Sequence, residues 1–216
     1  MDADIPTAPR WQRRPEARPE EILDAAFQVF CENGFVRTKL EDVARAAGVS
    51  KGTLYLYFDS KESLFREMVR AKVIPIVEEG EAMVQSHRGS YRDLLVSLMT
   101  RMFDILQKRG LGRISRLVTS ELGAFPELAR FYFDEVVLRG RRLLDLVLER
   151  GVAAGEFRPF ASRYGARGVQ HMLLHAAATQ CTFQQFDPRA LSDDEVLEGI
   201  IDLYLNGVLV RAEPSR

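Results

Sequence analysis

Apolar side chains recur at every third or fourth position over most of the chain, which is the spacing that gives an α-helix one buried face. The first such segment runs from Pro19 to Asn33. Pro19 suits the first position of a helix, where its missing N–H leaves no hydrogen bond unmade. Asn33 and Gly34 suit the end, because both tolerate the left-handed backbone that closes a helix. The apolar positions of this helix are Ile22, Leu23, Ala26, Phe27 and Phe30.

Two short helices follow closely. Thr38 and Glu41 form a T-x-x-E capping box, which predicts that a helix starts at Thr38. Gly48 ends that helix, and Ser50 caps a third one that runs to Tyr57. Two short helices joined by a tight glycine turn are the pattern of a helix-turn-helix. Together with the first helix they predict a three-helix unit, whose expected core comprises Phe27, Phe30, Leu40, Val43, Leu54 and Phe58.

The third helix has an unusual outward face. Leu54 and Phe58 lie four positions apart and point into the predicted core. The side chains left over are those of Lys51, Thr53, Tyr55 and Tyr57. A lysine, a glycine and two tyrosines at a helix start suit a helix that lies in the major groove of DNA, where hydroxyl and ammonium groups reach phosphates. A plain turn between packed helices, with tyrosines on the surface, would give the same spacing, so both interpretations stay open.

The rest of the chain keeps the helical period. One helix begins at Lys61 and runs toward Gln85, and Pro75 predicts a kink or a displaced break within it. Ser192 and Glu195 form a second capping box before the last helix. The further helices are predicted over 91–108, 111–122, 125–153, 161–183 and 192–211.

No segment alternates as a β-strand would, so the sequence predicts an all-α fold of about nine helices. Residues 1–17 are rich in proline, alanine and arginine and are expected to form a flexible arm. Residues 18–65 would form the helix-turn-helix domain, and residues 66–216 a larger helical bundle.

Composition and charge say less about function than the helical pattern does. The 216 residues are 46% hydrophobic and carry a formal net charge of -1, with a pI near 6.3. That balance counts mildly against a nucleic-acid binder, whose binding domain is often strongly basic. Arg10, Arg13 and Arg14 of the arm could follow a DNA groove, or the arm could be a solvated tail.

No apolar run is long enough to span a bilayer, and no secretory leader opens the chain, so a cytoplasmic protein is expected by default. Cys31 and Cys181 are too few for a disulfide framework. Both lie in apolar helical patterns and are expected to be buried, inert thiols. A redox sensor is the alternative for this pair.

The stretch AFQVFCENGFVRTKLEDVARAAGVSKGTLYLYFDSKESLF resembles the DNA-binding domain of TetR-family (tetracycline-repressor-like) transcriptional regulators. The resemblance runs from about residue 18 to 65 and makes the helix over 50–57 the recognition helix. It implies contacts with base edges or phosphates from that helix, and phosphate contacts around it. The implied DNA-binding residues are Thr38, Lys39, Ser50, Lys51, Gly52, Thr53, Tyr55, Tyr57 and Lys61. Leu56 contributes a methyl contact or none.

The C-terminal region is rich in phenylalanine and methionine. Such stripes are usually core, but helical bundles also place ligands between facing helices, and methionine walls adapt to varied apolar molecules. Regulators of the TetR family usually bind an effector there, so the resemblance implies an apolar or aromatic small molecule. The candidate ligand-binding residues are Met102, Phe103, Leu106, Leu117, Glu121, Phe133 and His175. His171 and His175 have metal-ligand spacing but no adjoining ligand cluster, so neither a metal nor a cofactor is predicted.

The last two helices are candidates for self-association. The segments HMLLHAAATQ and EVLEGIIDLYLNGVL combine small residues, which permit close helix packing, with a broad apolar stripe. One chain could bury this stripe internally. The resemblance instead implies a four-helix interface in a homodimer, which would match the two-fold symmetry of a palindromic DNA site. The candidate interface residues are Met172, Ala176, Thr179, Phe183, Ile200, Leu203, Tyr204 and Val208.

The leading functional prediction is a homodimeric regulator, not an enzyme, that represses from a palindromic operator until a small-molecule effector releases it. A DNA-binding activator or an effector-independent regulator is the first alternative. A more remote one is an enzyme that uses the helical cavity, with Glu121 or His175 as its acid or base. The sequence contains no phosphate-binding loop, nucleophile motif or metal motif that would favour an enzyme.

Overall fold

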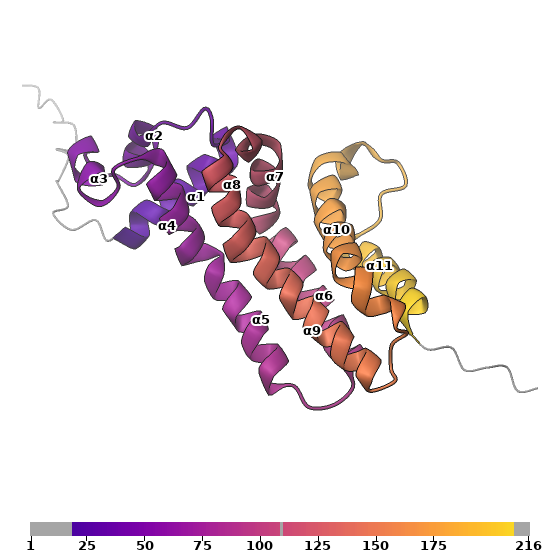
Figure 1. Ribbon diagram of the computed structural model, residues 1–216. Coiled ribbons are helices and arrows are strands. Elements are labelled where there is room, and N and C mark those ends of the chain that lie inside the picture. The colour runs from indigo at the N-terminus through magenta and orange to yellow at the C-terminus, as the bar shows by residue number, and fades with distance from the viewer. Residues whose placement is uncertain (1–18, 109, 210–216) are drawn as a thin grey trace, which may run out of the picture.

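The computed structural model describes residues 19–108 and 110–209, and its regular elements there are helical. Figure 1 shows the N-terminal helices gathered at one end, the next helices running away from them, and a last pair along one side. The first four are α1 (Pro19–Asn33), α2 (Leu40–Ala46), α3 (Lys51–Tyr57) and α4 (Lys61–Lys72). The others are α5 (Ile74–Ser86), α6 (Tyr91–Lys108), α7 (Leu111–Glu121), α8 (Pro126–Tyr132), α9 (Leu138–Ala153), α10 (Phe160–Phe183) and α11 (Asp193–Val208). The predicted all-α class is confirmed. The expected arm at 1–17 lies outside the described residues.

Two of the predicted helices are each divided. The helix expected from Lys61 breaks at Val73, and Pro75 occupies the first turn of α5. The proline lacks the N–H that a continuous helix would use, so it displaces the break toward the N-terminus. The long helix expected over 125–153 contains a π-helical stretch, Phe133–Val137, between α8 and α9. A π-helical turn inserts an extra residue into a helix and often lies at a functional site.

Most of the predicted helix starts are found, but one is wrong. Ser50, Ser60 and Ser192 each cap a helix through the side-chain oxygen. Thr38 does not, because its hydroxyl donates to the carbonyl oxygen of Gly34 at 2.6 Å. That carbonyl is freed at the end of α1 and needs a donor. Helix α2 therefore begins two residues later than predicted, at Leu40, with Lys39 as its cap.

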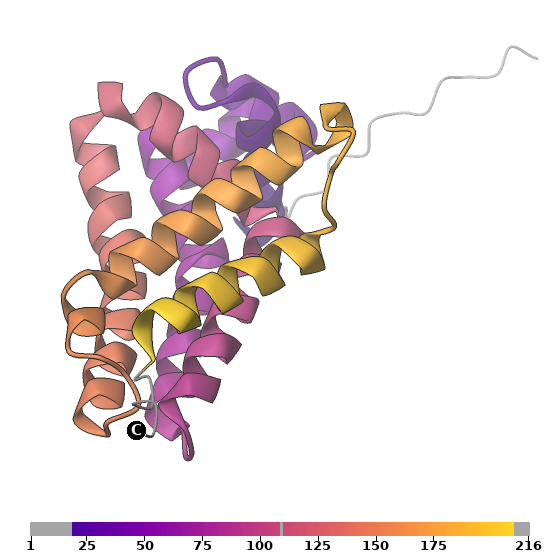
Figure 2. The same ribbon diagram turned by 90° about the vertical axis from the view of Figure 1, so that its right-hand side faces the viewer.

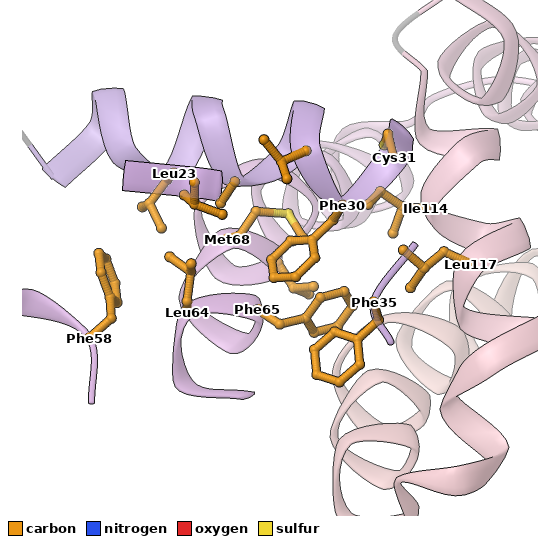
Figure 3. Close-up of a cluster of buried hydrophobic side chains, with 14 of the residues drawn as sticks. Leu23, Phe30, Cys31, Phe35, Phe58, Leu64, Phe65, Met68, Ile114 and Leu117 are labelled. Atoms are coloured by element: carbon orange, nitrogen blue, oxygen red, sulfur yellow. The ribbon is translucent and has the colours of Figure 1, made fainter. Parts of the chain in front are cut away.

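The first core joins the four short helices to part of the body. Phe30, Phe35 and Phe65 form a ring cluster with centroids 5.5 to 5.6 Å apart. Figure 3 shows Ile114 and Leu117 of α7 beside this cluster. The short helices are marginal alone and bury their apolar faces against α7 and α8. The boundary predicted after residue 65 therefore falls inside a shared core.

The second core holds the far end together and involves α6, α9, α10 and α11. Gly165 of α10 permits a close helix crossing, because a Cβ there would collide with Leu148 and the Tyr204 hydroxyl. Figure 2 shows α10 and α11 side by side across one face of the molecule. None of the described helices is long and apolar enough to cross a membrane.

The two cysteines differ. Cys31 is buried against α7, and desolvation raises the pKa of its thiol to about 11. It is therefore protonated and unreactive near neutral pH, as predicted. The prediction for Cys181 is wrong, because this residue is exposed near the end of α10. The helix extends there beyond the core that covers its middle.

Candidate nucleic-acid interface and apolar cavity

Helix α3 presents an exposed face rich in side chains that suit DNA. Leu54 is fully buried and fixes the helix against the first core. On the other side, Tyr55, Leu56 and Tyr57 are 42%, 83% and 49% exposed. Lys51 is exposed as well. The division predicted between inward and outward positions of this helix is therefore present. Figure 1 shows α3 at one end of the molecule.

Lys51 is held across the helix-turn-helix. Its ammonium pairs with the carboxylate of Glu41 on α2 at 2.5 Å and lies 5.6 Å from the ring centre of Tyr55. The hydrogen bond with Glu41 raises the pKa of Lys51, so the side chain stays cationic. Glu41 thus contacts the next helix instead of completing the capping box predicted with Thr38.

The remaining predicted DNA-binding residues differ in how much of each side chain is exposed. Gly52 and Lys39 are exposed. The Ser50 hydroxyl accepts a hydrogen bond from the Thr53 N–H at 3.0 Å and therefore caps the start of α3. Thr53 itself is half-buried.

Thr38 and Lys61 are turned toward the protein. Thr38 is only 1% exposed. The Lys61 ammonium donates to the carbonyl oxygens of Phe35 and Val36 at 2.7 and 3.2 Å. These two side chains tie the α1–α2 loop to its neighbours, and their geometry favours a supporting role over a phosphate contact.

A partly open cavity of about 170 Å³ lies among α5, α6, α7, α9 and α10. Its wall is mainly apolar and includes the π-helical stretch. The lining residues are Val73, Ile76, Val77, Gly80, Leu98, Arg101, Met102, Ile105, Leu106, Leu111, Ser115, Tyr132, Val136, Val137, Gly140, Leu143, Leu144, Gln170 and Leu174. A concave apolar site with few polar groups is typical of small-molecule binding.

Of the seven predicted ligand-binding residues, Met102 and Leu106 line this cavity. Phe103 is buried in the second core and Leu117 in the first. Phe133 and His175 are exposed. Glu121 contacts the α1–α2 loop instead. The sequence did not predict that Arg101, Tyr132 and Gln170 line the cavity. The rotation of each helix about its axis depends on packing with distant segments, which no local pattern reveals.

Helix α7 connects the cavity with the helix-turn-helix. Leu111 and Ser115 line the cavity, and Leu117 packs in the first core. At the end of the helix, the carboxylate of Glu121 accepts a hydrogen bond from the Val36 N–H at 2.8 Å. This carboxylate lies against Gly34, whose φ of 81° also requires glycine. One rigid element therefore touches both regions.

The predicted dimer residues divide into three sets by exposure. Tyr204 and Val208 are 8% and 5% exposed, because they pack inside the protomer's own second core. Leu203 and Phe183 are 70% and 60% exposed. Partly exposed positions between them are Met172, Ala176, Thr179 and Ile200. An apolar face thus remains on the α10–α11 side of the molecule.

An exposed second helix of a helix-turn-helix, joined to a helical body with an apolar cavity, is an arrangement found in DNA-binding regulators. Comparison with known families agrees. Residues 22–68 match the model of bacterial regulatory proteins of the tetR family, and residues 93–207 match the C-terminal domain of AefR-like transcriptional repressors. The chain belongs to the TetR family of transcriptional regulators, as its sequence predicted.

Named relatives are regulators of the same kind. The chain is 41% identical over 188 residues to the transcriptional regulator RutR of Escherichia coli K12, covering 86% of this chain and 82% of that protein. It is 33% identical over 148 residues to the repressor KstR2 of Rhodococcus jostii, covering 65% and 68%. The fatty acid metabolism regulator protein of Bacillus subtilis is 25% identical over 199 residues, covering 91% and 97%.

Solved structures share the fold. FadR of Bacillus subtilis in complex with stearoyl-CoA superposes with a TM-score of 0.74 at 23% identity, covering 88% of this chain and 99% of that one. A transcriptional regulator from Saccharomonospora viridis in complex with choline gives a TM-score of 0.76 at 19% identity, covering 89% and 98%.

Proposed function

We propose that this regulator is a homodimeric repressor that binds a palindromic operator through α3 and leaves it when a small apolar molecule enters the cavity. The observation that carries the proposal is the path of α7, which lines the cavity at Ser115 and holds the α1–α2 loop through Glu121. A ligand that shifts α7 would alter the position of α3, the proposed recognition helix. The coupling required is ordinary, about 1–3 kcal/mol. The protein would act in the cytoplasm, where the operator lies.

The DNA contacts come from the outward face of α3. Tyr55 and Tyr57 supply hydroxyls and ring edges, and Lys51 supplies a cation that can move from Glu41 to a phosphate. Lys39, exposed at the start of α2, adds a phosphate contact. Two copies of this surface are needed to read two half-sites.

The dimer is proposed to form through the outer face of α10 and α11. Leu203 and Phe183 are large apolar side chains that water covers in the single chain. Burying them against their copies would follow the usual isologous arrangement of a two-fold interface. Tyr204 and Val208 support this face from inside.

Two features favour a small-molecule effector over an effector-independent regulator. The cavity is concave and mostly apolar and has few polar groups, as small-molecule sites usually do. Relatives of this fold are described with stearoyl-CoA and with choline. The enzyme alternative loses its candidates, because neither Glu121 nor His175 lines the cavity.

Filling the cavity tests the proposal. Gly140 lines it, and a Cβ there would meet only Gln170, at 3.9 Å. Gly140→Leu should therefore occupy the space without disturbing α9. We expect this variant to bind the operator and to resist apolar compounds that release the wild type, measured by fluorescence anisotropy of labelled operator. Equal release of both proteins would contradict an effector site in this cavity.

A further inference from the structure

The cavity has one charged side chain among the described residues that line it. This is Arg101 of α6, which also lines a second, open depression beside Val96 and Asp104. One end of its guanidinium pairs with Glu79 of α5. The Nε is buried and has no hydrogen-bond partner within residues 19–108 and 110–209. A buried donor without an acceptor is costly, so an acceptor on a bound molecule would be favourable there.

The pair with Glu79 leaves Arg101 available to a ligand. The Glu79 side chain is 52% exposed, and half-exposed ion pairs contribute little. A guanidinium also carries several N–H donors in a planar fork that matches a carboxylate. A ligand carboxylate could therefore share Arg101 with Glu79 or replace it.

The other polar groups of the cavity carry no charge. Gln170 is 5% exposed, and its amide donates to the Val137 carbonyl oxygen at 3.3 Å. Its own oxygen accepts from Arg141 at 3.4 Å. Burial raises the pKa of Tyr132, which keeps its hydroxyl neutral. A cationic ligand would find no carboxylate among the described lining residues, and it would be repelled by Arg101.

The volume limits the size of the occupant. About 170 Å³ is close to the size of an engineered cavity of roughly 150 Å³ that holds benzene. A single ring or a short alkyl chain therefore fits the site.

We propose that the effector of this regulator is a small apolar carboxylate, of one aromatic ring or a short alkyl chain, whose carboxylate binds Arg101. The inference rests on the proposed function, since it assigns the chemistry of the same cavity. Where the ligand replaces Glu79, α6 loses its Arg101 ion pair with α5. Helix α5 begins at the break beside Val73, which lines the cavity and also packs in the first core.

Matched ligands test the charge. Binding of benzoate and hexanoate to the intact protein would be measured by titration calorimetry, beside benzamide, hexanamide and benzylamine. We expect each carboxylate to bind at least about ten-fold more tightly than its amide, the factor that one charge-assisted hydrogen bond provides. Benzylamine should not bind.

Two variants locate the effect. Arg101→Gln should remove the preference for carboxylates, and Arg101→Lys, which keeps the charge but loses the Nε donor, should retain part of it. Arg139→Gln is the matched control, because Arg139 also pairs with a glutamate of α5, Glu81, but does not line the cavity. This control should bind carboxylates as the wild type does.

The inference is overturned if benzoate and benzamide bind equally, if no carboxylate binds at millimolar concentration, or if Arg101→Gln and Arg139→Gln behave alike. The proposed function fails separately. If neutral apolar compounds release the operator from the wild type but not from Gly140→Leu, the cavity is the effector site and only its charge preference is wrong. If Gly140→Leu responds as the wild type does, the proposed function itself is contradicted.

Discussion

Single residues of α3 divide between holding the helix and reading DNA. Leu54 is fully buried, whereas the neighbouring Tyr55 is 42% exposed, because consecutive residues of a helix point about 100° apart. The Tyr55 ring also lies beside the Lys51 ammonium, which orients both side chains on the outward face. The position combines an apolar ring edge with a hydroxyl, so its two contributions can be separated by substitution.

Tyr55→Phe removes the hydroxyl and keeps the ring, whereas Tyr55→Ala removes both. We expect the first to weaken operator binding about ten-fold or less and the second by about ten- to a hundred-fold, because a good base contact contributes about 1–3 kcal/mol. Fluorescence anisotropy with labelled operator at fixed salt gives both values. Thermal unfolding should be unchanged, since the ring lies outside the core. Operator affinity unaffected by Tyr55→Ala would remove α3 from the interface.

At the scale of elements, α7 is the helix that connects the cavity with the helix-turn-helix. Ser115 of α7 lines the cavity, and Leu117 packs in the first core. The side-chain carboxylate of Glu121, at the end of the helix, binds the α1–α2 loop. The ring of Phe125, just after α7, packs edge-on against Phe35 of the α1–α2 loop at 4.9 Å. A displacement of α7 is therefore transmitted to the loop through direct contact.

Glu121→Ala should remove the hydrogen bond between α7 and the α1–α2 loop. The Val36 N–H would lose its acceptor, so we expect its hydrogen exchange to accelerate and the protein to lose about 1 kcal/mol of stability. Operator affinity should fall several-fold, because the loop between α1 and α2 is less well fixed. Ser120→Ala, one residue earlier and bonded only within α7, is the control. Unchanged exchange at Val36 in the glutamate variant would argue against this route.

The elements were more predictable from the sequence than the sites. Helices such as Tyr91–Lys108 were placed to the residue, because caps, glycines and apolar periods are local signals. The cavity wall was not, because it depends on how each helix is rotated. Leu174 lines the cavity while the predicted His175 beside it is exposed. The outward face of α3 was predictable, since one short helix with two clear core positions leaves few alternatives.

At the scale of the whole molecule, the reading surface and the proposed dimer face lie far apart along the chain but belong to one function. Figure 1 shows α3 at one end and α10 and α11 along the opposite side. Two protomers joined through α10 and α11 would fix the separation of their two α3 helices. That separation has to match the spacing of the half-sites, about 34–36 Å or a multiple of it.

Leu203→Glu tests the dimer, because it places a charge at the centre of the proposed apolar face, where Leu203 is 70% exposed in the single chain. We expect monomers in sedimentation velocity with an unchanged fold. Phe133→Glu, at an exposed ring outside α10 and α11, is the control and should remain dimeric. A dimer that survives Leu203→Glu would place the interface elsewhere.

The most direct measurement is selection of genomic DNA fragments by the purified wild type, by Leu203→Glu and by Tyr55→Ala. A dimer that reads DNA through α3 should enrich one palindromic sequence, and both variants should lose that enrichment, one by losing the second reading helix and the other by losing a base contact. Enrichment of the same palindrome by either variant, or of a sequence without two-fold symmetry by the wild type, would contradict the account.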